Sequence, residues 1–376
     1  MAEIHLRVAE LRKSKNMTQQ DLADRMGVSF QSISKWENGG SMPDIQLLPE
    51  LAELFSVSVD QLLGLCPLEH EMYFPEKTDE GGFWNEKLEY LKRTRKTFFH
   101  SEYVEYLIKS VFNIHEPIHI LDCGCGYGYL AQLLLPHLPE GSTYTGVDFA
   151  ADLIAFGKKE FREAPWKIDF VEADFFSWHS LKKYDMVTEM AVLRHISNPE
   201  QFLQKMISHT KPGGYVVSIE CNREFECDGL YIDGLDYFML CEHSGLTKKW
   251  QTELSRRERD YAIAMRMPDL MRKAGLCDIG VRMDDMVNYV TPETPNYEQL
   301  KEDFISYNDW NSNIDPSQRE GLIRHFMTRN MTRREAEEYC DRNKIVMEAL
   351  NAEDSTFLFF KPHMVTFGRK KDRGEV

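Results

Sequence analysis

Apolar positions recur with a helical period through the first 65 residues of the chain. Leu6, Val8 and Leu11 alternate with charged positions near the start, which predicts an amphipathic helix over residues 4–15. Thr18 and Ser29 are expected to cap the next two helices, and Gly27 is expected to end the first of them. Four more helices are expected, over residues 19–26, 30–37, 44–55 and 58–65. The pattern therefore predicts an all-α five-helix domain at residues 1–66.

After residue 82 the pattern changes to short apolar runs that alternate with helical stretches. The polar, turn-rich residues 67–82 are interpreted as a linker, and residues 83–113 as one or two aromatic, amphipathic helices. Such alternation is typical of a mostly parallel sheet with helices on both faces. Strands are expected at residues 120–123, 143–149, 168–174, 184–190, 215–220, 278–290 and 355–370. We expect an α/β domain at residues 83–376 with helical insertions near 222–275 and 292–354. The first insertion is expected to contain a helical run from Lys248 to Ala274.

A glycine-rich turn follows the first of these strands. The apolar run ends at Asp122, and Gly124, Gly126 and Gly128 stand at alternate positions before a helical pattern begins at Tyr129. This is the signature of a strand, a tight turn and a helix. Because glycine leaves the backbone bare, a ligand can press against peptide groups there, and a nucleotide-like ligand is expected.

The motif Asp-x-Gly-x-Gly-x-Gly and three later motifs of the chain resemble the class I S-adenosylmethionine-dependent methyltransferases. The later motifs come in the family's order: Gly-Val-Asp-Phe at 146–149, Val-Glu-Ala-Asp-Phe at 171–175 and Lys-Pro-Gly-Gly at 211–214. The resemblance implies a Rossmann-like methyltransferase domain with a seven-stranded sheet. It also implies S-adenosylmethionine as the cofactor.

The resemblance assigns the cofactor to residues at the carboxyl ends of the first four strands. Asp148, about 20 residues after the glycines, is expected to take the ribose hydroxyls. Asp174 and Phe175 are expected to lie against the adenine. The complete predicted set is Asp122, Gly124, Cys125, Gly126, Gly128, Asp148, Phe149, Asp174, Phe175 and Glu189.

The residues expected to face a methyl acceptor follow the fourth strand or precede the first. Methyl transfer from a sulfonium is an in-line displacement, so a base is needed only when the acceptor must lose a proton. His195 is the candidate base, and Arg194 and Glu189 are candidate contacts; packing or capping alone is the other interpretation of His195. Trp84, Tyr90 and Tyr103 are candidates for the acceptor pocket, or else pack on the core.

Residues 17–39 resemble the lambda-repressor/Cro-like helix-turn-helix family of DNA-binding domains. Thr-Gln-Gln at 18–20, Gly27 and the run Gln-Ser-Ile-Ser-Lys-Trp-Glu-Asn-Gly at 31–39 fall in the family's order. The resemblance implies a phosphate contact from the second helix and base contacts from the third. The residues implied are Gln19, Phe30, Gln31, Ser32 and Lys35. A domain retained only for assembly is the alternative.

Charge and composition limit which kinds of binding partner and methyl acceptor the chain can be expected to have. The chain carries a net charge of −16, which opposes non-specific DNA binding. Two copies on a pseudo-palindromic operator would restore affinity, so a homodimer is expected. The acidic charge and the absence of an Asn-Pro-Pro-Tyr run favour a small-molecule acceptor over a nucleic acid.

Other features bear on the environment. No apolar run reaches the roughly 18 residues of a membrane span, so no membrane partner and a cytoplasmic location are expected. The eight cysteines match no common zinc spacing, and we expect reduced thiols and no metal. The sequence thus predicts a small-molecule methyltransferase fused to a DNA-binding regulator. A regulator whose methyltransferase-like domain senses S-adenosylmethionine or a metabolite without turnover is the alternative.

Overall fold

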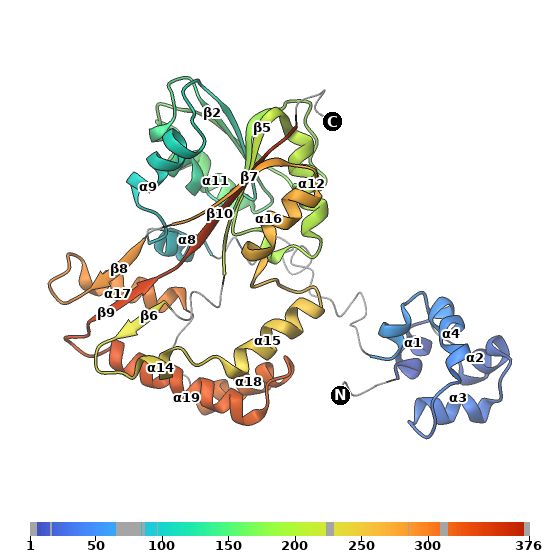
Figure 1. The fold of residues 1–376 in the computed structure, drawn as a ribbon. Helices are drawn as coiled ribbons and strands as arrows, with labels where there is room; N and C mark the ends of the chain where they lie inside the picture. Colours follow the sequence, from blue (N-terminus) through green and yellow to red (C-terminus); the bar gives the residue numbers. More distant parts are fainter. Residues whose placement is uncertain are drawn as a thin grey trace. The chain divides into compact units, whose positions relative to one another are not determined.

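The structure, a computed structural model, describes residues 6–15, 17–64, 84, 87–95, 97–222, 229–284, 286–308 and 315–371. The chain divides into two compact units, Met1–Tyr73 and Phe74–Val376, each described here by itself (Figure 1). The predicted linker, residues 67–82, lies outside the described residues.

The first unit is all-helical, as predicted. Thr18 accepts the backbone N–H of Asp21 and the Asp21 carboxylate accepts that of Thr18, which forms a capping box at the second helix. Gly27 ends that helix in the left-handed region, and Ser29 caps the third. Leu22, Ile33 and Leu51 are fully buried in the core between the helices. The helices are α1 Val8–Ser14, α2 Gln19–Met26, α3 Phe30–Glu37, α4 Leu48–Phe55 and α5 Val59–Leu62, with a 3-10 turn, η1, at Ile45–Leu47.

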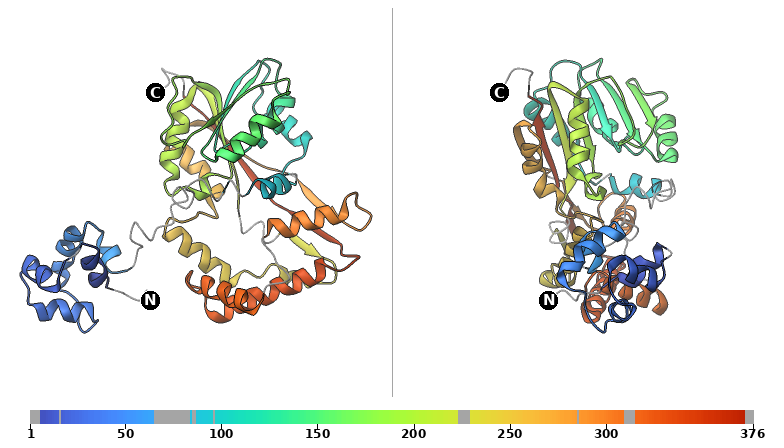
Figure 2. Two further views of the ribbon diagram at one scale, coloured as in Figure 1. Left: turned by 180° about the vertical axis from the view of Figure 1, so that it is seen from behind. Right: turned by 90° about the vertical axis from the view of Figure 1, so that its right-hand side faces the viewer.

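A seven-stranded sheet forms the centre of the second unit, in the order β3-β2-β1-β4-β5-β10-β7. The first five strands run parallel, and β10 is antiparallel to both of its neighbours. Helices cover both faces of the sheet, which confirms the predicted Rossmann-like class (Figures 1 and 2). The strands are β1 His119–Cys123, β2 Thr143–Asp148, β3 Lys167–Glu172, β4 Tyr184–Met190, β5 Thr210–Cys221, β7 Cys277–Met283 and β10 His363–Arg369.

Each face of the sheet has its own apolar core. On one face, Ile120 and Tyr144 pack with Phe98, Ile108 and Leu130. On the other, the core is built from helices α12 and α16 against β1, β4 and β5. The helices of the first face are α9 Ser101–Tyr106 with the π-helical turn η3 Leu107–Val111, α10 Tyr129–Leu134 with η4 Leu135–His137, and α11 Ala151–Glu160; those of the second are α12 Pro199–His209 and α16 Ile263–Lys273.

Two of the predicted strands each divide into two. The stretch expected at 278–290 forms β7 and β8 (Val287–Val290), and that at 355–370 forms β9 (Phe357–Phe360) and β10. Pro362, which has no backbone N–H to donate, stands between β9 and β10. Here the two chain segments are tied together, since Asp284 N–H donates to the His363 carbonyl at 3.0 Å and His363 N–H donates to the Asp284 carboxylate at 3.1 Å.

Beyond that break the chain forms a lid with its own sheet, β6-β9-β8. Its strand order repeats that of β5-β10-β7, because each lid strand adjoins one of these three along the chain (Figure 1). The helical run expected from Lys248 to Ala274 is broken near Arg257, whose φ is 55°, and only the second half belongs to the sheet core. The remaining elements are α8 Leu88–Arg95, β6 Leu230–Ile232, α14 Tyr237–Leu240, α15 Ser244–Ser255, α17 Tyr297–Tyr307, α18 Pro316–Met327 and α19 Arg333–Leu350.

Candidate functional site

The glycine loop joins β1 to α10 at the carboxyl edge of the sheet. Gly124, Gly126 and Gly128 have φ values of 80°, 53° and 90°, a region that favours glycine. The loop is anchored to β2, because Gly124 N–H donates to the Val147 carbonyl at 2.8 Å. A side chain at Gly128 would come within 2.6 Å of the Phe170 ring. Backbone conformation and packing therefore both require glycine here.

Asp122 lies beneath this loop and is almost completely buried. The Tyr144 hydroxyl donates a hydrogen bond to its Oδ2, and burial raises the pKa of the Asp122 carboxyl to about 7. Its Oδ1 is buried without a hydrogen-bond partner among the residues that the structure describes. A buried carboxylate oxygen in this state is a ready acceptor for a donor or cation on a ligand.

Asp148, Phe149 and Asp174 line the same edge of the sheet. The Asp148 carboxylate accepts the N–H groups of Gly126 and Ala150, at 2.8 and 2.9 Å, so it holds the glycine loop in place. A carboxylate oxygen has two lone pairs and can accept more than one donor. Phe149 is 38% exposed, and the exposed Asp174 caps the turn that follows β3. These positions are compatible with the predicted contacts to ribose and adenine.

Three predicted cofactor residues instead turn their side chains into the interior. The Phe175 ring packs in the α12 core, 4.9 Å from the Phe202 ring. The Cys125 thiol is buried, which raises its pKa, and it lies where a side chain on Gly146 would stand. Glu189 is completely buried in β4. These three side chains are buried in this structure, and their contact with a cofactor stays a prediction.

Glu189 pairs with a second buried carboxyl, Glu220 of β5. The Glu189 carboxyl bonds the Ser218 hydroxyl and accepts Val192 N–H at 3.1 Å, while Glu220 accepts Arg194 N–H at 3.2 Å. Burial and the neighbouring Glu220 raise the pKa of Glu189, and burial raises the pKa of Glu220 to about 7. The pair therefore supports the turn after β4 from below, and it retains protons near neutral pH.

That turn, with η5 at Leu193–His195, forms one wall of a cavity of about 390 Å³. Four of the residues predicted for the acceptor side line it, namely Trp84, Tyr90, Arg194 and His195, whereas the buried Glu189 and Tyr103 do not. The Trp84 and His195 rings meet edge to face at 5.5 Å. The turn also touches the glycine loop, since a side chain on Gly124 would lie 2.5 Å from Val192. The cavity thus opens beside the predicted cofactor site.

His195 is held as a neutral imidazole. Arg194 Nε donates to its Nε2 at 3.2 Å, and burial together with the Arg259, Arg194 and Arg95 guanidinium groups keeps the pKa of His195 well below its usual value. Its Nε2 lone pair is therefore engaged, so His195 can accept a proton from a substrate only if Arg194 moves. Arg194 is itself anchored by donating to the Cys221 sulfur at 2.8 Å.

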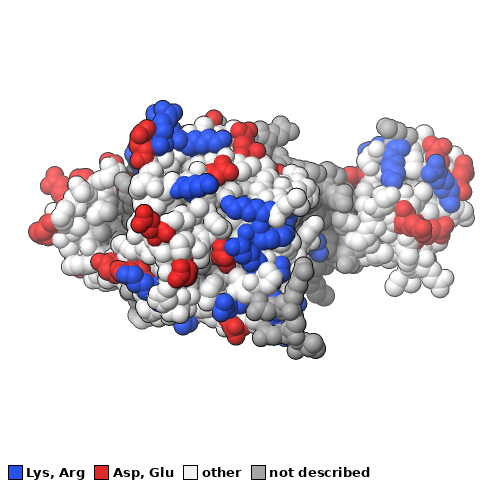
Figure 3. Space-filling model, turned by 90° about the horizontal axis from the view of Figure 1, so that it is seen from above, with Lys and Arg blue, Asp and Glu red and all other residues white. Residues whose placement is uncertain are grey.

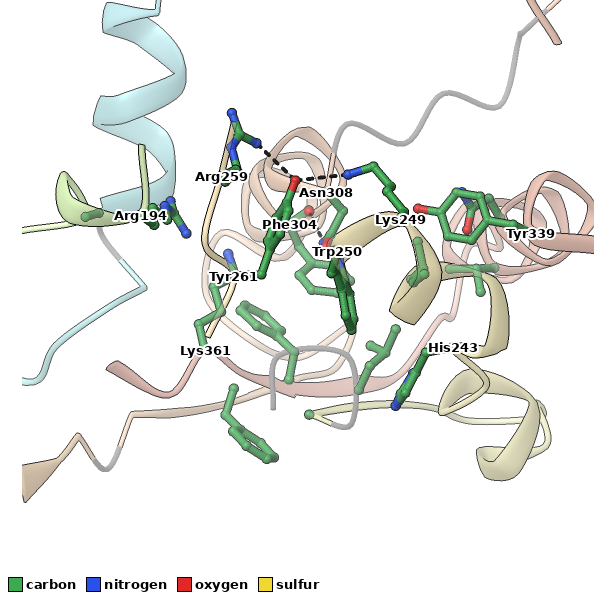
Figure 4. Close-up of a pocket in the computed structure, with 18 of the residues that line it drawn as sticks. Arg194, His243, Lys249, Trp250, Arg259, Tyr261, Phe304, Asn308, Tyr339 and Lys361 are labelled. Carbon is green, nitrogen blue, oxygen red and sulfur yellow. Dashed lines mark hydrogen bonds between the residues drawn. The ribbon is translucent and has the colours of Figure 1, made fainter. Parts of the chain in front are cut away.

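The remaining walls come from the lid, and sequence reasoning missed them. Lys249 and Arg259 donate to the Tyr261 hydroxyl at 3.0 and 3.3 Å, and all three line the cavity (Figure 4). Trp250 and Lys361 line it as well. The sequence signal that was available is the density of basic residues at 248–259, but it does not reveal which of them face inward.

In the first unit, the predicted DNA contacts lie on or near α3. Phe30, Gln31 and Lys35 are exposed on this helix, whereas the Ser32 hydroxyl bonds Ser29 at 2.9 Å. Gln19 donates from its side chain to Glu37 at 2.7 Å. A phosphate contact from Gln19 therefore falls to its backbone N–H at the start of α2 or to the remaining side-chain N–H.

Two other kinds of site are absent from the described residues. None of their helices combines the length and apolar character needed to cross a bilayer. Their His, Cys, Asp and Glu side chains form no cluster of three or more that could hold a metal ion.

Comparison with known proteins gives two family matches. Residues 8–62 match the helix-turn-helix family model, and residues 120–214 match the methyltransferase domain model. Among curated proteins, a ubiquinone biosynthesis O-methyltransferase from Rickettsia akari is 28% identical over 158 residues, 42% of this chain and 62% of that protein. One of the same name from Coxiella burnetii is 30% identical over 120 residues, 32% of this chain and 50% of that protein. The chain therefore spans half to three-fifths of these relatives.

The solved structures with a similar fold include methyltransferases. Phosphoethanolamine N-methyltransferase 2 of Haemonchus contortus, in complex with S-adenosyl-L-methionine, is 13% identical with a TM-score of 0.43, covering 80% of this chain and 60% of that one. A methyltransferase of Galdieria sulphuraria, described as acting on sarcosine and dimethylglycine, is 15% identical with a TM-score of 0.38, covering 73% and 85%. From the two family matches and the fold, the chain joins a helix-turn-helix domain to a class I methyltransferase domain.

Proposed function

We propose that the chain is an S-adenosylmethionine-dependent methyltransferase for a small molecule, joined to a sequence-specific DNA-binding regulator domain. The observation that carries the enzyme half is the unpartnered, buried Oδ1 of Asp122 beneath the glycine loop, in the described part of the chain. S-adenosylmethionine offers an ammonium group and a sulfonium, and a cation in this place would both satisfy that oxygen and favour the ionised carboxylate.

The other cofactor contacts follow from the same edge of the sheet. Asp148 is fixed by two backbone N–H groups and would accept the ribose hydroxyls. Phe149 and Asp174 would contact the adenine, and the glycines would let the backbone approach the methionine portion. The bound cofactor supplies the methyl group. The protein's part is to orient the acceptor in the adjoining cavity and to keep water out.

Binding of S-adenosylhomocysteine, measured by calorimetry, tests this site. We expect saturable binding that Asp148→Asn weakens at least about tenfold, because an amide accepts fewer hydrogen bonds than a carboxylate. Asp169→Asn is the matched control, since Asp169 is an exposed carboxylate on the neighbouring strand β3. If neither S-adenosylmethionine nor S-adenosylhomocysteine binds, the proposed enzyme is refuted.

A regulator that senses its ligand without turnover is the second candidate, and the state of His195 favours it. That imidazole is neutral but its Nε2 already accepts a hydrogen bond from Arg194. Methylation of an amine or thiolate needs no base from the protein, so the two functions separate by experiment. Release of S-adenosylhomocysteine in the presence of candidate acceptors supports the enzyme, and cofactor binding without release supports the sensor.

For the first unit we propose binding of double-stranded operator DNA by α3, as a homodimer. Gln31 and Lys35 are exposed on this helix and have the side chains that read adenine and guanine in the major groove. In the fluorescence anisotropy of a labelled operator, Gln31→Ala with Lys35→Ala should weaken binding at least about tenfold, while Lys13→Ala on α1 should not. If the unaltered protein, the double variant and Lys13→Ala bind the operator equally well, α3 does not read DNA and the domain serves assembly instead. Sedimentation equilibrium tests the dimer.

A further inference from the structure

The cavity beside His195 carries an excess of positive charge that the enzyme's cofactor does not explain. Of its described lining residues, seven are Lys or Arg, and only Glu242 is acidic. The chain as a whole has a net charge of −16, and on the face of the second unit shown in Figure 3 both signs are present. The cavity therefore differs in sign from the molecule around it.

Several of these cations lack a carboxylate partner. Among the described residues, Arg259 makes no ion pair and its guanidinium donates only to the Tyr261 hydroxyl. Arg342 lies over the Tyr339 ring at 5.3 Å and likewise has no carboxylate within ion-pair distance in the described parts of the chain. Lys249 does pair with Glu253, at 2.9 Å, but that carboxylate is shared with Arg329 at 3.7 Å. Like charges gathered in a partly buried space cost free energy unless an anion offsets them.

Tyr261 gives this cluster a defined geometry. Its hydroxyl oxygen accepts hydrogen bonds from both Lys249 Nζ and Arg259 Nη1, so the two cations are held on either side of one oxygen (Figure 4). Because both bonds are accepted, the hydroxyl's own proton is available to be donated. A ligand oxyanion placed there would meet two cations and an O–H donor.

A backbone hydrogen bond brings Arg194 to the same place. Asp260 N–H, next to Arg259 in sequence, donates to the Arg194 carbonyl at 3.0 Å. This joins the α15–α16 loop of the lid to the turn after β4. The combined effect of Arg194 and Arg259 also reaches His195, whose pKa they help to hold low. The cluster therefore lies at the end of the cavity nearest the glycine loop.

Aromatic side chains form a further part of the cavity wall. The Trp250 and Tyr261 rings lie 5.8 Å apart, and the Phe304 and Phe359 rings 4.3 Å apart. Lys361 Nζ lies over the last two, at 6.0 and 5.3 Å from their centres. Walls of this kind suit a flat, apolar molecule.

From these features we infer that the methyl acceptor is an aromatic molecule bearing an oxyanion, a carboxylate or a phosphate, which Arg259, Lys249 and Tyr261 bind. The inference rests on the proposed methyltransferase function and adds the chemical class of the acceptor. The aromatic portion lies against Trp250 and Phe304.

The test uses three probes of similar shape on the full chain saturated with S-adenosylhomocysteine. Benzoate and phenyl phosphate carry an oxyanion, and benzamide is a neutral analogue. By calorimetry, at least one of the anions should bind about tenfold or more tightly than benzamide, and its affinity should fall as salt is raised. If benzoate binds more tightly than phenyl phosphate, the oxyanion of the acceptor is a carboxylate; if phenyl phosphate binds more tightly, it is a phosphate.

Arg259→Gln should weaken binding of the preferred anion about tenfold, and Arg259→Lys should weaken it less because the charge is kept. The matched control is Arg257→Gln, an exposed arginine on the same loop that does not line the cavity. Equal affinity for benzamide and both anions, or equal effects of Arg259→Gln and Arg257→Gln, would overturn the inference.

The two proposals fail separately in this experiment. Affinity for S-adenosylhomocysteine is measured first in every variant and should stay within about twofold of the unaltered protein, since Arg259 belongs to the lid. Loss of cofactor binding in the unaltered protein refutes the proposed enzyme. Normal cofactor binding without a preference for anions refutes only the acceptor class.

Discussion

The two sides of the turn at residues 191–195 carry ionisable side chains of opposite kind. Towards the sheet lie the carboxyl groups of Asp122, Asp148, Glu189 and Glu220, and towards the lid lies the cationic cavity with Arg259. The acidic side is buried and each of its carboxyl groups is hydrogen bonded, whereas the basic side surrounds a space.

This difference suits the transfer of a methyl group from a cationic sulfonium to an anionic acceptor. In the proposed enzyme, a sulfonium beside Asp122 would favour the ionised form of that carboxyl, and the cationic cavity would select an anionic acceptor. In this proposal the two sides would orient the two ligands as well as bind them.

Gly128→Ala should have the largest effect, because it distorts the glycine loop on the acidic side of the turn. An alanine at this position would have to adopt a φ of 90°, and its Cβ would lie 2.6 Å from the Phe170 ring. We therefore expect about 2–5 kcal/mol of destabilisation. The affinity for S-adenosylhomocysteine should fall at least about tenfold because the loop has to shift. Urea unfolding and calorimetry measure the two effects.

Gly141→Ala is the control for backbone strain alone. Gly141 has nearly the same φ, 91°, but a side chain there meets only Pro117, at 3.5 Å. This variant should lose about 1 kcal/mol and bind the cofactor normally. Equal losses of cofactor affinity in the two variants would show that the packing of the loop is unimportant.

The same contrast explains how much the sequence predicted. The acidic side is made of strand ends with short, local motifs, so the glycine loop and Asp148 stand at the strand ends where the apolar pattern predicts them. The helix caps Thr18 and Ser29 were predicted for the same reason, because a cap acts within four residues. These motifs do not specify the direction of a side chain, and Glu189 and Phe175 turn inward because strand alternation and packing on α12 decide it.

The basic side could not be predicted because it is non-local. The lid sheet pairs three strands that begin at Leu230, Val287 and Phe357, and apolar periodicity does not specify which partners pair. Its cavity also joins Arg194 to Lys249 and Lys361, which are far apart in sequence. Only the folded lid shows that these cations share one space.

Glu220→Gln should have an intermediate effect, seen in the dependence of stability on pH. The Glu220 pKa, about 7, is raised above its usual value by burial, so the folded chain binds this proton more tightly than the unfolded chain. The contribution of Glu220 to the free energy of unfolding is therefore greatest at low pH. It falls as pH rises from about 5 through 7, by up to about 3 kcal/mol. Glutamine mimics the protonated carboxyl and should remove this part of the slope.

Urea unfolding between pH 5 and 8 measures that slope. Some dependence of stability on pH should remain in the variant, because the Asp122 pKa is also raised to about 7. Loss of the Asp122 proton destabilises the folded chain in the same direction. Glu172→Gln, at an exposed position on β3, is the control and should leave the slope unchanged. A slope that is the same in the Glu220 variant and the unaltered protein would contradict a protonated pair beneath the turn.

Tyr261→Phe should have the smallest effect, and it examines the basic side without changing its charge. The variant keeps Lys249 and Arg259 but removes the oxygen that holds them together and the proton that it can donate. Binding of the preferred anionic probe should weaken by a factor of about five, the equivalent of about 1 kcal/mol for one hydrogen bond. Cofactor affinity should not change.

Tyr339→Phe is the matched control, because Tyr339 also lines the cavity but its hydroxyl bridges neither cation. If both variants bind the anion equally well, charge alone determines affinity and the geometry set by Tyr261 contributes nothing.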